Sequence, residues 1–192
     1  MKLVALNTEK ANLSEEQFFN LCVSNSLLHI ERDKHQNIII MAPTGTIGGN
    51  RNLKICTELE IWNRKKNTGI TFDSSSGFRL PNGAMRAPDA AWITVKRWNK
   101  VPREEQEVFA PICPDFIIEV RSKSDTLKQQ KEKMEDWMEN GCRLAWLVDP
   151  YSRNTLVYLP DAKPTKHPFS ETLLGGEVLP GFELKLDDII QP

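Results

Sequence analysis

The sequence predicts an α/β domain in which helices pack on a mixed β-sheet. Across residues 51–150 the hydrophobic pattern alternates between helical periodicity and short apolar runs, in the order α-β-β-β-α-β. This alternation favours a sheet covered by helices. The chain has 192 residues, 40% hydrophobic and 27% charged, which suits one well-buried core. We therefore expect a single domain over residues 1–192, with its core at about 51–150 and additions at both ends.

Two elements are expected before the core. Residues 12–25 should form a helix. Ser14 can cap its N-terminus, and Phe18 and Cys22 share one face. The next segment, HIERDKHQNIIIMAP, predicts two short strands around a polar turn at residues 33–37.

The core is expected to begin with a glycine-rich loop, GTIGGNRN, and a helix over about residues 51–66. A strand hairpin or meander follows, with its turn at Pro81-Asn82-Gly83. The run FIIEV at 116–120 predicts a strand buried on both faces. A helix over about 125–140 and the buried strand RLAWLVDP come next. A C-terminal hairpin around NTLVYL and a strand near 182–186 complete the chain.

Charge and cysteine usage narrow the possible functions. A formal net charge of -1 gives no broad basic surface, so any DNA contact should be confined to a few phosphates. The four cysteines form no CxxC pair, which indicates reduced core thiols rather than a zinc site. No stretch approaches the ~20 apolar residues of a membrane span, and the N-terminal apolar run is too short for a signal peptide. We expect a cytoplasmic protein without a membrane partner.

Two acidic residues stand where strands should be buried. Glu119 lies within FIIEV, where an uncompensated carboxylate is costly. Arg121, two residues on, shares its face and would form a structural ion pair with it. Alternatively a metal ion compensates Glu119, and Asp89, near the start of the neighbouring strand, supplies a second carboxylate. Oxygen ligands in this low number suit Mg²⁺ or Mn²⁺ better than zinc.

The helix after this strand offers a lysine. Arg121 cannot act as a base, because the pKa of arginine lies above ~12, although it can hold a phosphate. On the helix Lys133 lies beside the apolar face, one turn before Trp137, and Gln130 falls within that face. Lys128 points into water. A lysine at such a position either reaches the site or extends along the helix into solvent.

The blocks APTG, GFRLPNGAMRAPDAAWI, PDFIIEVRSKSD and KMEDWMENGCRLAWLVDP resemble the Uma-type restriction endonuclease family of the PD-(D/E)XK nuclease superfamily. The resemblance covers roughly residues 13–189 and implies a restriction-endonuclease-like core. It also implies metal ligands at Asp89 and Glu119. Lys133 matches a family lysine that has moved from the strand to the helix, and Trp137 stands where the family often has tyrosine.

Members of this superfamily often add an acidic residue from the first core helix. Glu60 matches best here, while Glu58 and the earlier Glu31 stay open. A solvated helix carboxylate is the ordinary alternative for Glu60. Many family members have a histidine in the loop before this helix, where the present chain reads GGNRN, and Asn50 is the candidate that is left there.

Together these residues predict an endonuclease that depends on Mg²⁺ or Mn²⁺ and hydrolyses DNA phosphodiester bonds. Asp89 and Glu119 would hold the metal. Lys133 would orient or deprotonate the attacking water or stabilise the transition state, and Arg121 would contact a phosphate oxygen or brace Glu119. Cutting both strands needs two sites, so a homodimer is expected. The alternatives are a catalytically silent module of this fold that binds nucleic acid or protein, and a metal-dependent hydrolase of another phosphate ester.

Overall fold

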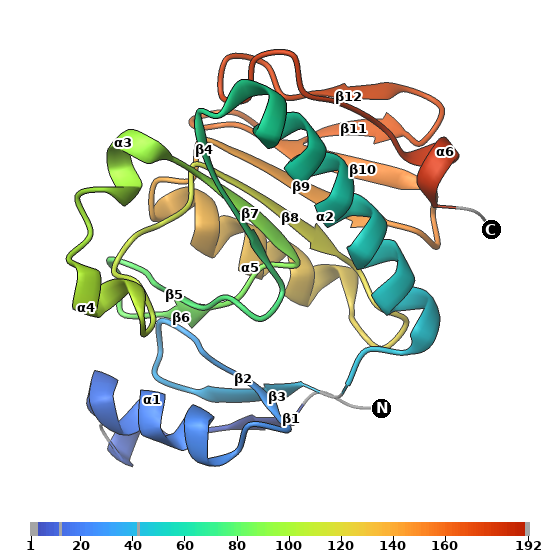
Figure 1. Cartoon of the computed structure of the whole chain (residues 1–192). Helices are drawn as coiled ribbons and strands as arrows, with labels where there is room; N and C mark the ends of the chain where they lie inside the picture. The colour runs from blue at the N-terminus through green and yellow to red at the C-terminus, as the bar shows by residue number, and fades with distance from the viewer. Residues whose placement is uncertain (1–3, 12, 42, 191–192) are drawn as a thin grey trace.

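A six-stranded sheet with the order β11-β10-β9-β8-β7-β4 forms the centre of the molecule (Figure 1). The computed structural model describes residues 4–11, 13–41 and 43–190. Strands β8 and β9 are parallel and the other neighbours are antiparallel, so the sheet is mixed. The strands are β4 (Gly69–Asp73), β7 (Ala90–Thr94), β8 (Phe116–Val120), β9 (Leu144–Asp149), β10 (Asn154–Tyr158) and β11 (Thr165–Pro168).

Two long helices, α2 (Thr46–Lys66) and α5 (Leu127–Glu139), cover opposite faces of this sheet (Figure 1). Alternate residues of β8 divide between them: Ile118 belongs to the core on the α2 side, and Ile117 to the core on the α5 side. This division follows from the two-residue period of a strand. The run FIIEV is therefore buried on both faces, as its composition predicts.

A second sheet, with the order β1-β3-β2-β6-β5, lies beside the central one. Helix α1 (Glu15–Ser24) packs on it, with Phe18 against Ile38 and Met85. The hairpin β5-β6 crosses to this sheet from the chain between β4 and β7, so β6 leads straight into the Asp89 segment. The strands are β1 (Val4–Leu6), β2 (His29–Arg32), β3 (Ile38–Met41), β5 (Phe78–Arg79) and β6 (Met85–Arg86).

The remaining short elements cover the edges. They are a 3-10 helix (Glu9–Ala11), α3 (Val95–Trp98), α4 (Arg103–Gln106), β12 (Thr172–Leu174), β13 (Glu183–Lys185) and α6 (Leu186–Ile189). Strands β12 and β13 pair with each other, and Phe182 beside them stacks on Trp146 of β9. Along the part of the chain that the structure covers, no helix has the length and apolar composition needed to cross a membrane.

The mixed α/β class predicted from the sequence is confirmed. Helix α1 begins after Ser14, which caps it as predicted, while residue 12 lies outside the described residues. The turn at residues 81–83 is also found, but it joins only β5 and β6, and the longer strands on either side pair with each other.

The glycine-rich segment was wrongly predicted to be a loop. Helix α2 begins at Thr46 and runs through Gly48 and Gly49, with the Gly49 N–H donating to the Gly45 carbonyl at 3.0 Å. Glycine weakens a helix by only about 1 kcal/mol per residue. The buried Ile55 and Leu59 further along α2 anchor it to the sheet, and this packing outweighs the local preference.

Candidate active site

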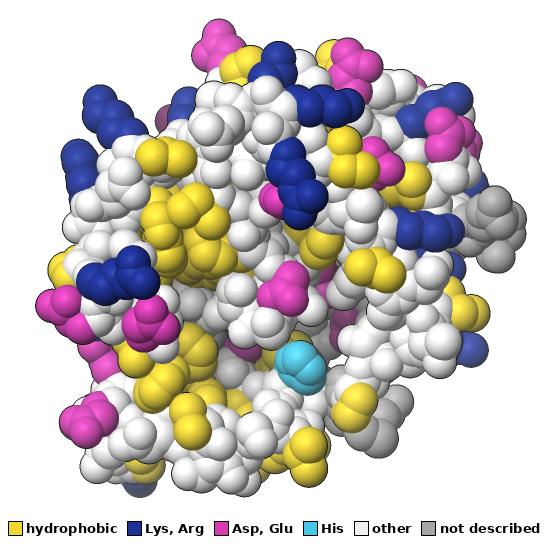
Figure 2. Space-filling model, in the orientation of Figure 1, with side chains coloured by type: hydrophobic (Ala, Val, Ile, Leu, Met, Phe, Trp, Pro, Cys, Tyr) yellow, Lys and Arg dark blue, Asp and Glu magenta, His cyan; other side chains and the backbone are white. Residues whose placement is uncertain are grey.

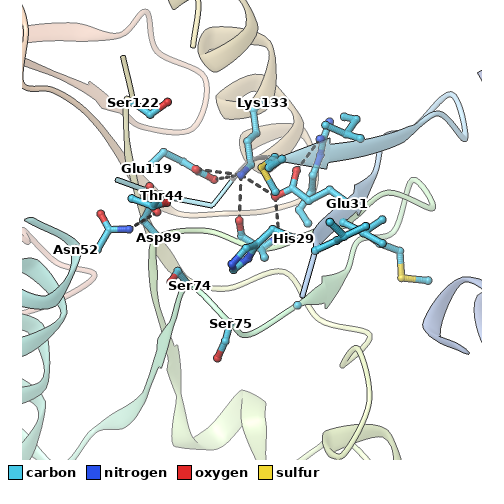
Figure 3. Close-up of a pocket in the computed structure, with 18 of the residues that line it drawn as sticks. His29, Glu31, Thr44, Asn52, Ser74, Ser75, Asp89, Glu119, Ser122 and Lys133 are labelled. Atoms are coloured by element: carbon cyan, nitrogen blue, oxygen red, sulfur yellow. Dashed lines mark hydrogen bonds and ion pairs between the residues drawn. The ribbon is translucent and has the colours of Figure 1, made fainter. Parts of the chain in front are cut away.

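A cleft of about 1070 Å³ opens between the two sheets, and α2 and α5 contribute to its lining. Figure 2 shows this face hollowed between its lower and upper parts, with acidic side chains visible inside the hollow. The cleft is lined by Glu31, Asp89, Glu119 and Lys133. Figure 3 shows Lys133 reaching down between Glu119 and Glu31, with Asp89 next to Glu119. Residues from four separate elements thus meet at one point.

Asp89 lies immediately before β7 and opposite Glu119. The antiparallel register pairs Ala90 with Ile118, and it places the preceding residue across from the following one. Asp89 Oδ2 accepts a hydrogen bond from the Val120 backbone N–H at 2.6 Å. Its Oδ1 accepts from the Asn52 side chain, also at 2.6 Å. Both of these donors are neutral.

Burial raises the pKa of Asp89, although the Val120 N–H and the Lys133 charge oppose the effect. Its carboxylate is fixed in place by Asn52 and Val120, yet among the described residues it forms no ion pair. The site thus presents a carboxylate that is oriented but only weakly compensated.

Glu119 of β8 is 3% exposed and accepts from two side chains of α5. Its Oε1 accepts from Trp137 Nε1 at 2.9 Å, and Lys133 Nζ lies 2.9 Å from Oε1 and 3.0 Å from Oε2. Burial raises the pKa of Glu119 to about 7; Lys133 lowers it, while the charges of Asp89 and Glu31 add to the rise. The carboxyl group is therefore poised to exchange a proton for another cation near neutral pH.

Lys133 is held by three partners in the cleft wall. Its Nζ lies 2.8 Å from Glu31 Oε1, donates to the Ala87 carbonyl at 3.0 Å, and pairs with Glu119. Burial lowers the pKa of Lys133, but Glu119 and Glu31 outweigh this and the pKa is raised. The ammonium therefore stays charged at neutral pH. Lys128, by contrast, points into solvent with its side chain 87% exposed.

Glu31 of β2 is the acidic residue that joins the site. Its side chain is 2% exposed, and its Oε1 accepts from the Ala87 backbone N–H at 3.1 Å. Burial raises the pKa of Glu31, but Lys133 and Arg86 outweigh it and lower the pKa overall. Glu31 is therefore ionised and keeps Lys133 charged.

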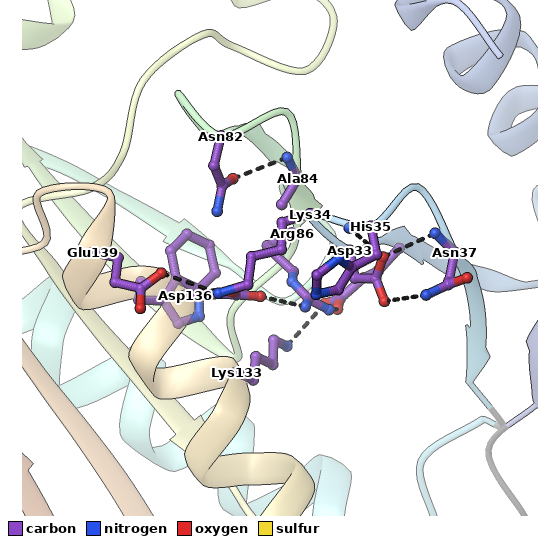
Figure 4. Close-up of polar contacts among 12 residues, drawn as sticks. Asp33, Lys34, His35, Asn37, Asn82, Ala84, Arg86, Lys133, Asp136 and Glu139 are labelled. Carbon is purple, nitrogen blue, oxygen red and sulfur yellow. Dashed lines mark hydrogen bonds and ion pairs between the residues drawn. The ribbon is translucent and has the colours of Figure 1, made fainter. Parts of the chain in front are cut away.

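A line of ion pairs connects Glu31 with the surface, and Figure 4 shows its members Arg86, Asp136, Lys34 and Glu139. Arg86 Nη1 lies 3.0 Å from Glu31 Oε2, and its Nη2 lies 2.6 Å from Asp136 Oδ2. Lys34 then lies 3.3 Å from Asp136 Oδ1 and 3.1 Å from Glu139 Oε2. Charges alternate in sign along this line, which compensates the buried members and fixes the N-terminal sheet against α5.

Two predicted site residues lie elsewhere. Arg121 Nη1 lies 3.0 Å from Asp149 Oδ2, and its Nε donates to the Asp125 carbonyl at 3.2 Å. The predicted ion pair of Arg121 with Glu119 is not among the contacts in the described residues. Glu60 is half-buried and accepts from Arg64 at 2.7 Å and from the Thr71 hydroxyl of β4. It is not among the residues that line the cleft.

The side-chain amides of Gln130 and Asn52 also line the cleft. Gln130 lines it, and its buried Oε1 has no hydrogen-bond partner in the part of the chain described. Asn52 lines it as well, although only Asn50 was considered from the sequence. Asn52 falls where the predicted loop and the predicted helix meet, and its contact with Asp89 joins segments 37 residues apart in the chain. Asn50 itself is exposed.

Asp89 and Glu119 are the carboxylates that could hold a divalent metal. Among residues 4–11, 13–41 and 43–190 no group of three or more acidic, histidine or cysteine side chains is arranged around a common point for an ion. Mg²⁺, however, keeps several waters and is commonly held by one or two carboxylates together with substrate phosphates. Each carboxylate oxygen has two lone pairs, so the observed hydrogen bonds leave acceptor positions on both residues. The donor set therefore fits a Mg²⁺ or Mn²⁺ ion.

Fold and cleft together define a nuclease-like α/β protein. The chain belongs to the Uma2 family, described as "Putative restriction endonuclease", whose family model matches residues 15–187. Among solved structures it is similar to "a putative nuclease belonging to DUF820" from Anabaena variabilis. That crystal structure has a TM-score of 0.75 and 16% identity, and the match covers 93% of this chain and 97% of that one. At this identity the likeness concerns the fold. The comparison with curated proteins gives no match.

Proposed function

We propose that this protein is an endonuclease that uses Mg²⁺ or Mn²⁺ to hydrolyse phosphodiester bonds in DNA. The observation that carries the proposal is the convergence of Asp89, Glu119 and Lys133 in one cleft, although each comes from a different element. The Lys133 ammonium lies between Glu119 and Glu31, and Asp89 has only neutral donors. This arrangement leaves the site short of positive charge, which favours a bound divalent cation. The cation would in turn attract the negatively charged phosphate of a substrate.

Asp89 and Glu119 would hold the metal, which when bound lowers the pKa of water and neutralises charge on a phosphate. Asn52 and the Val120 N–H fix the Asp89 carboxylate, and Trp137 fixes Glu119. These hydrogen bonds set the direction of both ligand groups before substrate arrives.

Lys133 would act through its charge. Its raised pKa keeps the proton on Nζ, so it is a poor proton acceptor at neutral pH. Its three N–H donors are engaged by Glu119, Glu31 and the Ala87 carbonyl in the free protein. A phosphate oxygen that enters beside Glu119 would exchange with one of these acceptors, and the ammonium would then stabilise the negative charge of the transition state.

The test is incubation of supercoiled plasmid with purified protein in Mg²⁺, Mn²⁺ or excess EDTA. Asp89→Asn should abolish nicking, because it removes a ligand charge without changing size. Glu60→Gln is the matched control, since it removes one carboxylate charge outside the cleft, and it should cut at the wild-type rate. Cleavage in EDTA, or equal cleavage by Asp89→Asn, would contradict the proposal. Retardation of the plasmid without any cleavage would favour the catalytically silent module.

Cleavage of both strands would require two such sites, so we extend the proposal to a pair of copies on duplex DNA. One cleft engages one scissile phosphodiester at a time, which supports this extension. Light scattering of the protein with a short duplex should give the mass of two chains. A single chain per duplex, with nicked plasmid as the end product, would refute the pairing and leave the hydrolysis proposal intact.

A further inference from the structure

A tyrosine with two arginines against its ring lies beyond the end of β9. The Arg121 guanidinium carbon lies 5.5 Å from the centre of the Tyr151 ring, and that of Arg51 lies 5.9 Å from the same centre. Tyr151 is 49% exposed, so the group is open to solvent on at least one side. Both distances fall within the range of cation–π contacts. The tyrosine ring therefore orients two guanidinium groups at the surface.

The two arginines differ in what else they contact. Arg121 is engaged by Asp149 at 3.0 Å and by the Asp125 carbonyl. The Arg51 side chain forms no ion pair or hydrogen bond with any residue that the structure describes, and its buried Nε has no partner there. A guanidinium group carries five N–H donors and binds phosphate with two of them side by side. Arg51 is thus a charged group that is oriented but has no anion.

The two arginines of this group are the chain neighbours of the residues that hold Asp89. Arg51 precedes Asn52, which donates to Asp89, and Arg121 follows Val120, whose N–H also donates to Asp89. In the parallel register Val120 pairs with Val148, so Tyr151 follows just beyond the neighbouring strand end. Adjacent strands lie ~4.8 Å apart, and two strand spacings separate β7, which follows Asp89, from β9, which precedes Tyr151. This distance is about the length of a few nucleotides at 3.4 Å each.

We propose that Arg51, held against the ring of Tyr151, binds a backbone phosphate of the DNA strand a few nucleotides from the scissile one. This inference rests on the proposed function, because the strand that passes Asp89 is the one that reaches Arg51. Arg51 then makes the phosphate contact that the sequence predicts for Arg121, because the charge of Arg121 is already neutralised by Asp149. Tyr151 is a positioning residue in this scheme: it fixes the guanidinium plane and leaves the N–H edge free for phosphate.

The test is the affinity of the full-length protein for a fluorescein-labelled duplex in Ca²⁺, measured by anisotropy over a range of salt concentrations. Arg51→Gln should raise Kd by about tenfold and reduce the slope of log Kd against log salt by about 0.9, the value for one lost phosphate contact. Arg103→Gln is the matched control, because this arginine is 86% exposed and does not line the cleft, and it should change neither quantity. Arg51→Lys should keep the salt slope while binding less tightly, and Tyr151→Leu should weaken binding with a smaller change in slope.

Thermal melts of each variant separate loss of binding from loss of folding. If Arg51→Gln and Arg103→Gln share the wild-type Kd and salt slope, the phosphate site is refuted, and plasmid cleavage by wild type would leave the proposed function standing. If the slope depends on Arg51 but plasmid stays intact in Mg²⁺ and Mn²⁺, the phosphate site stands and hydrolysis fails. Absence of duplex binding by wild type would overturn the inference outright.

Discussion

Replacing Lys133 with methionine removes the cation that two buried carboxylates share. Nζ lies 2.8 Å from Glu31 Oε1 and 2.9 Å from Glu119 Oε1, and these two side chains are 2% and 4% exposed. Methionine keeps most of the unbranched stem, so the packing of α5 against the cleft wall changes little. The perturbation is therefore mainly electrostatic.

The expected cost follows from the geometry. At these distances and an effective dielectric constant of about 20, Coulomb's law gives roughly 6 kcal/mol of gross attraction per pair. Desolvation offsets much of this, and breaking a buried pair from one side typically destabilises by about 3–5 kcal/mol. In Lys133→Met the pKa of Glu119, already raised to about 7, rises further, and that of Glu31 loses its largest depressing influence.

A carboxyl whose pKa is higher in the folded than in the unfolded state stabilises the fold only while it is protonated, and this stability is lost as pH rises towards the folded pKa. Lys133→Met should thus lose less stability at pH 5, where the carboxyl groups left without a cation can be protonated, than at pH 8, where it should lose about 3–5 kcal/mol. Urea denaturation at both pH values measures this. Lys128→Met on the exposed side of α5 is the control, and it should stay within about 0.5 kcal/mol at either pH. A variant that loses less than about 1 kcal/mol at pH 8 would show that Lys133 does not neutralise the two carboxylates.

Three further perturbations test other parts of the site. Mn²⁺ competes with a proton on Glu119, whose pKa is about 7, so affinity measured by calorimetry should fall by up to about tenfold per pH unit below 7 and level off above it; a flat profile from pH 6 to 8 would contradict this. Asn52→Ala removes the amide that orients Asp89, the other proposed metal ligand, and should lower Mn²⁺ affinity by about 10–100-fold. Asn50 is exposed, so Asn50→Ala should keep the wild-type Mn²⁺ affinity. Asp136→Asn interrupts the line of ion pairs and should lower the free energy of unfolding, measured in urea, by roughly 1–3 kcal/mol. Glu139→Gln is the control: this side chain is 60% exposed, so the free energy of unfolding should stay within about 0.5 kcal/mol of wild type. Equal losses in both variants would show that the buried ion pairs of the line do not stabilise the fold.

Much of the fold could be predicted because it is specified locally. The apolar runs of β8 and β9, the capping serine of α1 and the amphipathic face of α5 are each specified by a few neighbouring residues. The same local geometry brought Lys133 and Trp137 of α5 to one face, where the structure shows both in contact with Glu119. The start of α2 was missed because glycines were given more weight than the packing of the helix as a whole.

The partners of the site were harder to predict because they depend on contacts between distant segments. Glu31 meets Arg86 across a separation of 55 residues, through a sheet whose docking on the core has no signal in either segment alone. Arg121 was assigned to Glu119 because both share one face of β8. Residues two apart on a strand are ~6.7 Å apart, whereas the neighbouring strand lies only ~4.8 Å away. Asp149 on β9 is therefore the closer partner, and it takes the arginine.

The pairing of Arg121 with Asp149 explains why the lysine of this site comes from a helix. Once Asp149 engages the side chain two residues after Glu119, the strand can offer the cleft no cation at that position. Helix α5 packs across the strand and presents residues one turn apart, so Lys133 and Trp137 approach the two oxygens of a single carboxylate from the same side. Glu31 then supplies the second charge that raises the pKa of Lys133 and keeps it protonated. A strand lysine would need only its own strand to be formed. This site instead requires α5 and the N-terminal sheet to be docked, so its chemistry is coupled to the packing of the whole molecule.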